Sequence, residues 1–211
     1  MELEYIRIKT SGGLMYGGDQ KLFGKQAARS GCGMIAACDM LLYLEGRNAA
    51  PIPFKEYAAF AENFRDTVAY KNTANVLGIF PHRLVRILNE CGGKRFFEFY
   101  GRKKFRGDSG KSLAEFIGKS LEKGLPVIVR VGANGKSLPY EIRFPASGNK
   151  LRKGMVSWHY ITVTGISENG QLTFSSWGGK GIMSCADLQN HFGFTGGVIA
   201  ESQRPPSKTL V

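Results

Sequence analysis

The chain has few of the residues that build metal centres and disulfide frameworks. Its 211 residues include only four cysteines and three histidines. The cysteines form no CxxC pair, and they are too few and too scattered to staple a chain of this length. We therefore expect no disulfide framework, no metal site and no bound cofactor. The cysteines are Cys32, Cys38, Cys91 and Cys185.

Long apolar runs are also missing. The sequence contains no stretch of about 18 consecutive apolar residues, which argues against a membrane-spanning helix. Its first residues, MELEYIRIKT, alternate charged and apolar side chains and lack the apolar centre of a secretory signal. As written, the chain is expected to be cytoplasmic, or secreted if a leader was removed, and no membrane partner is expected.

The chain does contain an ordinary apolar fraction and an excess of positive charge. Hydrophobic residues make up 43% and charged residues 22%, which suits one globular domain with a sizeable core. Lysine and arginine number 29 against 17 acidic residues, so the net charge is +12. This balance favours an acidic partner, although a soluble basic surface explains it equally well. Nucleic acid is not expected as a partner, because no recognised binding motif frames the basic stretches.

The most informative stretch is residues 25–44, KQAARSGCGMIAACDMLLYL. Its first part is expected to be a polar loop. Its second part is apolar on nearly all sides, which predicts a helix inside the domain over about 33–44. Cys32 lies at the start of this helix between Gly31 and Gly33. The glycines leave the sulfur unshielded, and helix N–H groups together with the macrodipole stabilise a thiolate there. The pattern therefore suits a reactive thiol.

Polar groups near this helix have predictable roles. The backbone N–H of Cys32 lacks an intrahelical partner and can donate to an oxyanion. Gln26, six residues earlier, could supply a second donor. The other interpretation is that Cys32 is a small buried hydrophobe, as most cysteines are. Asp39, the one charge within the helix, needs a buried partner such as an arginine or a hydroxyl.

A general base would favour the reactive interpretation, and His159 is the best placed histidine. It stands at the entrance of a strand expected over about 160–166, in SWHYITVTGI, just after a loop rich in glycine and lysine. Sheet hydrogen bonds would hold this residue while leaving the ring open on one side, which suits a base. His82 and His191 are interpreted as ordinary surface or half-buried histidines.

Together these motifs resemble the papain-like cysteine peptidase superfamily. A Gln six residues before a Cys-Gly that opens a buried helix is one element, and the run from Ala36 or Ala37 to LLYLEG is another. With the His strand HYITVTGI, they are most similar to the bacterial branch that includes the bacteriocin leader peptidases, or double-glycine peptidases. The resemblance covers about 25–46 and 125–200. It implies an α+β papain-like fold, with the nucleophile helix packed on an antiparallel sheet.

The resemblance also implies catalytic roles. Cys32 is the nucleophile, His159 is the base, and Gln26 holds the oxyanion together with the Cys32 N–H. The position that orients the imidazole, Asn or Asp in the family, falls on Ser175 in FSSWGG. A serine hydroxyl is neutral and shorter than an asparagine, so this departure is expected to lower the rate more than to change the chemistry.

Three more residues complete the expected site. Trp177 would shield the contact between imidazole and serine from water, and core packing of the same side chain is compatible with that role. Trp158, Gly31 and Trp177 are expected to bind substrate, which would be a peptide or a protein.

The rest of the chain predicts one domain over residues 1–205, with a helical half at about 20–124, a β half at about 125–203 and a loose tail at 206–211. Residues 101–111 are expected to be a basic loop, and residues 134–154 an irregular insertion. The other expected helices are at about 54–69, 82–91, 112–123 and 186–191, and the strands at about 4–9, 95–100, 126–131, 160–166, 171–175 and 197–202.

The expected function is a cysteine peptidase or other thiol hydrolase that cleaves a peptide or amide bond. Two alternatives stay open. The missing Asn or Asp at Ser175 favours a catalytically weak or inactive domain that binds a peptide or protein partner in the same groove. Acyl transfer or deamidation uses the same Cys–His pair, because the first half-reaction is shared.

Overall fold

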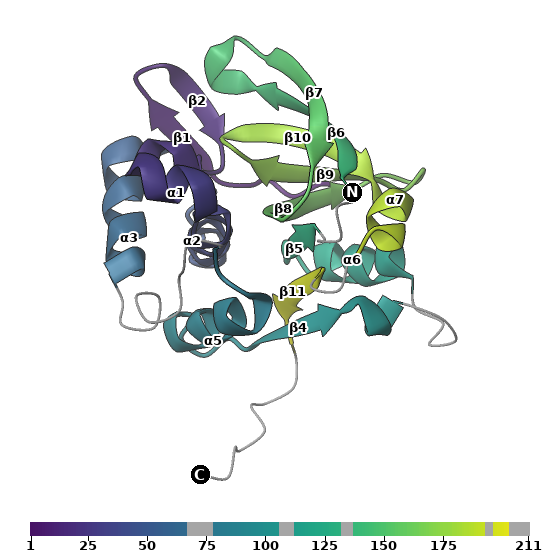
Figure 1. The fold of residues 1–211 in the computed structure, drawn as a ribbon. Coiled ribbons are helices and arrows are strands. Elements are labelled where there is room, and N and C mark those ends of the chain that lie inside the picture. The colour runs from purple at the N-terminus through teal and green to yellow at the C-terminus, as the bar shows by residue number, and fades with distance from the viewer. Residues whose placement is uncertain (67–77, 106–111, 132–136, 193–195, 203–211) are drawn as a thin grey trace, which may run out of the picture.

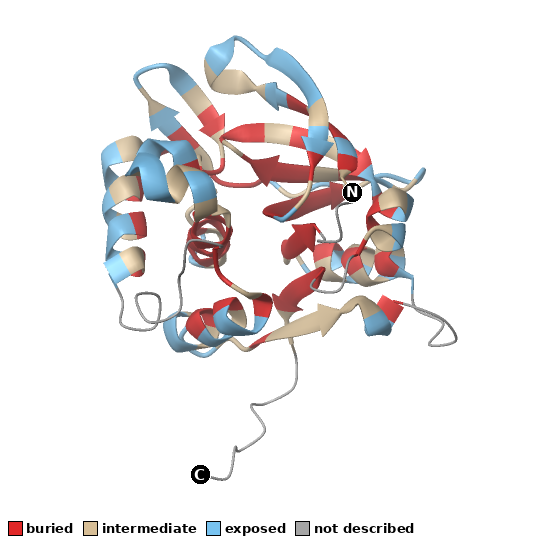
Figure 2. Cartoon of the chain, in the orientation of Figure 1, coloured by how far each residue is buried: buried red, intermediate tan, exposed pale blue. Residues whose placement is uncertain are grey.

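The buried helix predicted around Asp39 is present in the computed structural model, which describes residues 1–66, 78–105, 112–131, 137–192 and 196–202. It is α2 (Cys32–Leu44). Residues 33–42 are all buried, as the red ribbon of this helix in Figure 2 shows. Because α2 has no polar face, it can only be accommodated inside the domain.

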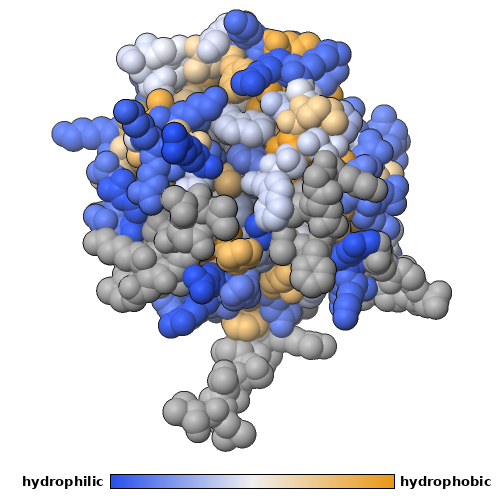
Figure 3. All heavy atoms as spheres, in the orientation of Figure 1, coloured by the Kyte–Doolittle hydropathy of each residue, from blue (hydrophilic) through white to orange (hydrophobic). Residues whose placement is uncertain are grey.

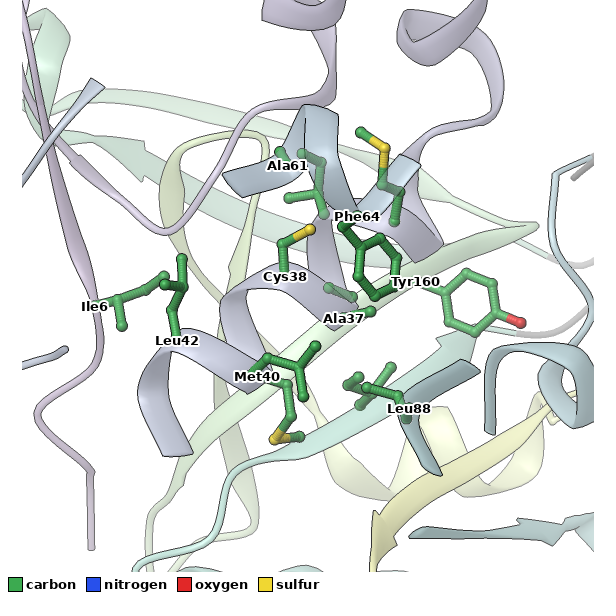
Figure 4. Packing of buried hydrophobic residues seen from close by; sticks show 14 of the residues in the cluster. Ile6, Ala37, Cys38, Met40, Leu42, Ala61, Phe64, Leu88 and Tyr160 are labelled. Atoms are coloured by element: carbon green, nitrogen blue, oxygen red, sulfur yellow. The ribbon is translucent and has the colours of Figure 1, made fainter. Parts of the chain in front are cut away.

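The other N-terminal helices pack around α2. Side chains from α2, α3, α5 and β8 meet in one apolar cluster, seen from close by in Figure 4. On α3, Tyr57, Ala61 and Phe64 form the buried stripe, at the spacing expected for one helix face. The elements on this side are η1 (Gln20–Phe23), α1 (Gly24–Ser30), α3 (Phe54–Asp66) and α5 (Pro81–Cys91).

An eight-stranded sheet forms the other half of the core, in the order β4-β11-β5-β8-β9-β10-β6-β7. Every neighbouring pair in it is antiparallel. The predicted α+β class with an antiparallel sheet is therefore confirmed. The strands are β4 (Phe97–Gly101), β5 (Val127–Val131), β6 (Leu138–Phe144), β7 (Lys150–Val156), β8 (His159–Ile166), β9 (Gln171–Ser176), β10 (Gly179–Ser184) and β11 (Gly197–Glu201).

The two faces of this sheet bury different cores. Tyr160 on β8 belongs to the cluster around α2, whereas its neighbour Ile161 belongs to a second cluster. This alternation follows from the pleat, which sends successive side chains to opposite faces. The second cluster is covered by α6 (Leu113–Glu122) and α7 (Cys185–Asn190), on the other side of the sheet in Figure 1.

A small three-stranded sheet, in the order β2-β1-β3, packs beside the first cluster. It consists of β1 (Arg7–Thr10), β2 (Gly13–Tyr16) and β3 (Ile52–Pro53). The glycine-rich segment before Gln26 therefore contains a strand as well as turns.

Two sequence predictions are wrong. The described part of the expected irregular insertion, residues 137–154, is instead regular, because β6 and β7 form an antiparallel hairpin there, joined through η3 (Pro145–Ser147); residues 134–136 lie outside the described residues. Leu138, Tyr140 and Ile142 alternate as buried residues, a period obscured by the basic side chains around them. In addition, the segment expected to be a polar loop before Cys32 is helical, as α1.

Some predictions fall partly on residues that the structure does not describe. The helix expected over 54–69 is described as far as Asp66. Part of the basic segment at 101–111 forms η2 (Arg102–Phe105), and residues 106–111 and the tail at 206–211 lie outside the described residues.

The face of the molecule seen in Figure 3 is predominantly hydrophilic. On the face seen in Figure 3, hydrophobic residues appear as small separate areas between hydrophilic ones. None of the described helices combines the length and the apolarity needed to cross a bilayer.

Candidate active site

Cys32 is the first residue of α2 and follows directly on a tight turn at Gly31. The backbone N–H of Gly31 donates to the carbonyl of Ala27 over 2.7 Å, which closes α1. A Cβ at position 31 would lie only 2.6 Å from that carbonyl oxygen. Gly31, expected in the substrate site, is thus buried and needed for the turn that carries Cys32.

The Cys32 thiol opens onto a cavity of about 10 Å³, room for roughly one water molecule. The lining includes Gln20, Tyr160, Ser176 and Trp177. Burial raises the pKa of the Cys32 thiol, while hydrogen bonding to the backbone of Tyr160 and the nearby guanidinium of Arg130 act in the opposite direction. The net shift is upward, so the resting cysteine is a neutral thiol.

The glutamine at this cavity is Gln20, and the prediction of Gln26 is corrected. Gln26 is exposed on α1, because this segment coils into a helix that turns it outward. Gln20 is 7% exposed and donates from Nε2 to the carbonyl of Ala28 over 2.8 Å. Its amide has a second N–H group available for an acceptor. Nothing in the spacing between Gln20 and Cys32 pointed to this residue.

His159 begins β8 and is held by two neighbours. Its Nε2 lies 2.7 Å from the hydroxyl of Ser176. Its ring stacks on Trp177, with centroids 4.2 Å apart and planes 13° from parallel. Burial lowers the pKa of His159 to about 3, so the imidazole is neutral in this environment.

The serine that contacts His159 is Ser176, and the prediction of Ser175 is corrected. Ser175 donates instead to the carbonyl of Tyr16 over 3.0 Å. Successive residues of β9 point to opposite faces, so only one of the two serines can face the imidazole. Ser176 lies on the same face as Phe174, whose side chain belongs to the second apolar cluster.

The thiol and the imidazole are not in contact, and His159 does not line the Cys32 cavity. Within the described residues, no hydrogen bond joins Cys32 to the His159 ring, and none reaches the Nδ1 of that ring. His159 pairs with Val131 on the face of the second cluster, whereas Cys32 packs with the first. Ser176 and Trp177 link them, since both line the Cys32 cavity and both contact His159.

Trp158 precedes His159 and adopts a left-handed backbone conformation, with φ of 52°. Its side chain is 57% exposed, an unusual position for so large an apolar group. Its ring lies 5.6 Å from the guanidinium of Arg130. Trp158 is therefore accessible to a ligand, as a substrate-binding residue must be.

Other features of the described chain are less suited to catalysis. A cavity of about 530 Å³ lies between α6 and β4, and neither cysteine nor histidine lines it. Its lining includes Tyr100, Phe116 and Lys119. Among the residues that the structure describes, no cluster of three or more His, Cys, Asp or Glu side chains is arranged to hold a metal ion.

No protein-family model matches this chain, and no curated protein sequence matches it. Its function is therefore inferred from its own residues and their geometry.

Proposed function

We propose that the chain adopts a papain-like fold and acts as a thiol hydrolase, with Cys32 attacking a peptide or amide carbonyl. One observation carries the proposal. Cys32, at the N-terminus of a buried helix, opens onto a cavity whose walls, Ser176 and Trp177, also hold His159. A cysteine at a helix start and an imidazole held by two residues of the same cavity are the two components that nucleophilic thiol catalysis requires.

In the proposed mechanism His159 moves protons and Cys32 forms and breaks the bonds. Nδ1 accepts the thiol proton, and the thiolate attacks the carbonyl carbon. The resulting oxyanion accepts hydrogen bonds from the Cys32 N–H and the Gln20 amide. The C–N bond then breaks as His159 gives its proton to the leaving amine. Water, deprotonated by His159, hydrolyses the thioester and restores the thiol.

Ser176 sets the tautomer in this scheme. For Nδ1 to accept a proton, the ring proton must lie on Nε2, so the Ser176 hydroxyl acts as the acceptor in the 2.7 Å contact. A neutral hydroxyl stabilises the imidazolium less than a carboxylate would. The proposed enzyme should therefore be slower than one with an acidic residue at this position.

The pair must come together when substrate binds. Catalytic hydrogen bonds are often long or absent in free enzymes and tighten only in the complex. Because both groups are neutral at rest, iodoacetamide should label Cys32 slowly in the free protein. A peptide-derived electrophile, such as a peptidyl vinyl sulfone, should label it much faster. This acceleration should require His159.

The direct test is digestion of a peptide library, read by mass spectrometry. We expect cleavage by the wild type, none by Cys32→Ala, and a loss of about 100-fold or more in His159→Gln. Cys91→Ala is the matched control, because Cys91 is an exposed free cysteine away from the cavity. The proposal is wrong if the wild type cleaves nothing and vinyl sulfone labelling of Cys32 is unchanged in His159→Gln.

The unbonded thiol and imidazole favour a second candidate, a domain that binds a peptide or protein partner without cleaving it. In that case the protein would bind peptides of the library without cleaving them, and Cys32→Ala would bind the same peptides as the wild type. Acyl transfer is a variant of the first proposal, and it would appear as an amine adduct when an amine is added to the digestion.

A further inference from the structure

Arg130 is a buried charge with no acceptor. It lies on β5 and is 5% exposed. Its Nη1 is sealed from solvent and has no hydrogen-bond partner, and within the described residues its guanidinium takes part in neither a hydrogen bond nor an ion pair. Buried guanidinium groups are normally paired, so one without an acceptor requires an explanation.

Three aromatic rings surround this charge. The guanidinium carbon lies 5.3 Å from the ring centroid of Phe80 and 5.6 Å from those of Trp158 and Tyr160. The rings attract the cation through their faces. They do not accept its N–H groups in the geometry of a carboxylate, so the donors remain free for a ligand.

The charge lies beside the nucleophile. Arg130 and Tyr160 are directly opposite in the β5–β8 pairing. The Tyr160 ring packs against Gly33, the residue after Cys32, where an added Cβ would lie 3.2 Å from it. The guanidinium also lies close enough to counteract the rise in the pKa of the Cys32 thiol. Positive charge, exposed Trp158 and thiol therefore belong to one site.

We infer that Arg130 binds a carboxylate of the molecule that reacts at Cys32, and so selects an acidic substrate. The planar guanidinium matches a carboxylate, and its single charge balances one. This inference rests on the proposed function in one respect, namely that the molecule bound by Arg130 is the substrate of the Cys32 thiol. The carboxylate could be the C-terminus of a peptide or an Asp or Glu side chain, and these share the same chemistry.

Two small alkylating agents test the inference without knowledge of the substrate. Iodoacetate carries a carboxylate, and iodoacetamide is its neutral counterpart. At Cys32 we measure the rate with iodoacetate divided by the rate with iodoacetamide. We expect this ratio to be at least about tenfold higher in the wild type than in Arg130→Gln. Taking the ratio cancels any change in thiol ionisation, and the ratio at Cys91 should be the same in both proteins. Equal ratios at Cys32 in the two folded proteins would overturn the inference.

A wild-type experiment decides the matter if Arg130→Gln does not fold. Acetate should slow the iodoacetamide labelling of Cys32, while acetamide should not, and neither should affect Cys91. No protection by acetate would overturn the inference. Stronger protection by phosphate than by acetate would also overturn it, because the site would then suit a different anion.

Three peptides of one neutral sequence distinguish the two sources of the carboxylate. One has a free C-terminus, one is amidated, and one is amidated with a single Glu. Protection of Cys32 by the first alone assigns the C-terminus, and protection by the third alone assigns the side chain. Equal protection by all three would overturn the inference.

The two proposals fail in different ways. Carboxylate-dependent labelling without peptide cleavage would leave an anion site beside a non-catalytic thiol, so the inference would stand and the hydrolase would not. Efficient cleavage of uncharged peptides, unchanged in Arg130→Gln, would keep the hydrolase and overturn the inference.

Discussion

Two buried ionisable side chains near Cys32, Asp39 and Arg130, differ in whether their hydrogen bonds are satisfied. Asp39, one of the residues lining the Cys32 cavity, accepts hydrogen bonds from the hydroxyl of Tyr57 over 2.6 Å and from the backbone N–H of Gly18 over 3.0 Å. The Arg130 guanidinium lies near three aromatic rings and, within the described residues, has no hydrogen-bond acceptor. A satisfied buried carboxyl organises the core, whereas an unsatisfied guanidinium is a place where a ligand can supply the missing acceptor.

The backbone approaches the Asp39 carboxyl and its partners closely on one side. A Cβ at Gly18 would lie 2.0 Å from the Tyr57 hydroxyl, and one at Gly17 would lie 2.6 Å from an Asp39 oxygen. The hydroxyl partner expected for Asp39 from the sequence is therefore present. This network ties α2, α3 and the segment before η1 together.

The largest expected effect comes from removing the Asp39 carboxyl. Asp39→Ala leaves the Tyr57 hydroxyl and the Gly18 N–H without an acceptor and opens a cavity, so the free energy of unfolding should fall by about 3 to 4 kcal/mol. Urea denaturation at neutral pH measures this. Glu62→Ala, on the exposed side of α3, is the control and should change stability by less than about 0.5 kcal/mol.

Removing one donor to the same carboxyl should cost less. Tyr57→Phe keeps the apolar ring in the core and deletes only the hydroxyl that bonds Asp39. We expect the free energy of unfolding to fall by about 2 kcal/mol, because a buried polar group loses one of its partners. A loss as large as that of Asp39→Ala would show that the ring position, and not the hydrogen bond, had been disturbed.

The contributions of Asp39 and His159 to the pH dependence of stability have opposite signs and should nearly cancel. Burial raises the pKa of Asp39 to about 7, so below that pH the native state keeps a proton that the unfolded chain has lost, and stability falls as pH rises from about 4 to 7. Burial lowers the pKa of His159 to about 3, so stability rises with pH between about 3 and 6.5. Each slope is about 1.4 kcal/mol per pH unit.

Single substitutions should expose each slope. In Asp39→Asn, stability should rise with pH between about 4 and 6.5, and in His159→Gln it should fall over the same interval. Urea titrations at several pH values provide the measurement. Identical profiles for both variants and the wild type would mean that neither group titrates with the shifted pKa.

The smallest expected effect on stability belongs to Arg130. Replacing an unpaired buried charge with an apolar side chain of similar length removes a desolvation cost, so Arg130→Met should change the free energy of unfolding by less than about 1 kcal/mol, or raise it. Arg95→Met is the contrast. Arg95 bonds Glu201 over 2.8 Å, and its loss should cost up to about 1 kcal/mol. A large destabilisation of Arg130→Met would show that Arg130 supports the fold.

The sequence predicted those site elements that depend on local pattern. The apolar run after Cys32 could only be an interior helix, and the alternating segment after His159 could only be a strand, so both were located correctly. The hairpin of β6 and β7 was missed because its buried apolar side chains lie among long basic ones, which obscures the strand pattern.

The choice between neighbouring candidates depended on tertiary structure. Whether Gln20 or Gln26 reaches the cavity is decided by how η1 and α1 pack against α2, which no local pattern specifies. Whether Ser175 or Ser176 faces His159 is decided by the register of β8 and β9, which shifts between Val163 and Gly165. A shift of one residue exchanges the faces of every side chain that follows.

The positions of the two tryptophans give the site its own optical signal. Trp158 and Trp177 are the only tryptophans in the chain, and both hold a left-handed backbone, with φ of 52° and 50°. One ring lies by the Arg130 guanidinium and the other stacks on the His159 ring. All of the tryptophan fluorescence of the protein therefore originates beside the candidate site. Occupation of the guanidinium by an anion, or a change in the stacked imidazole, can be followed by emission without any attached dye.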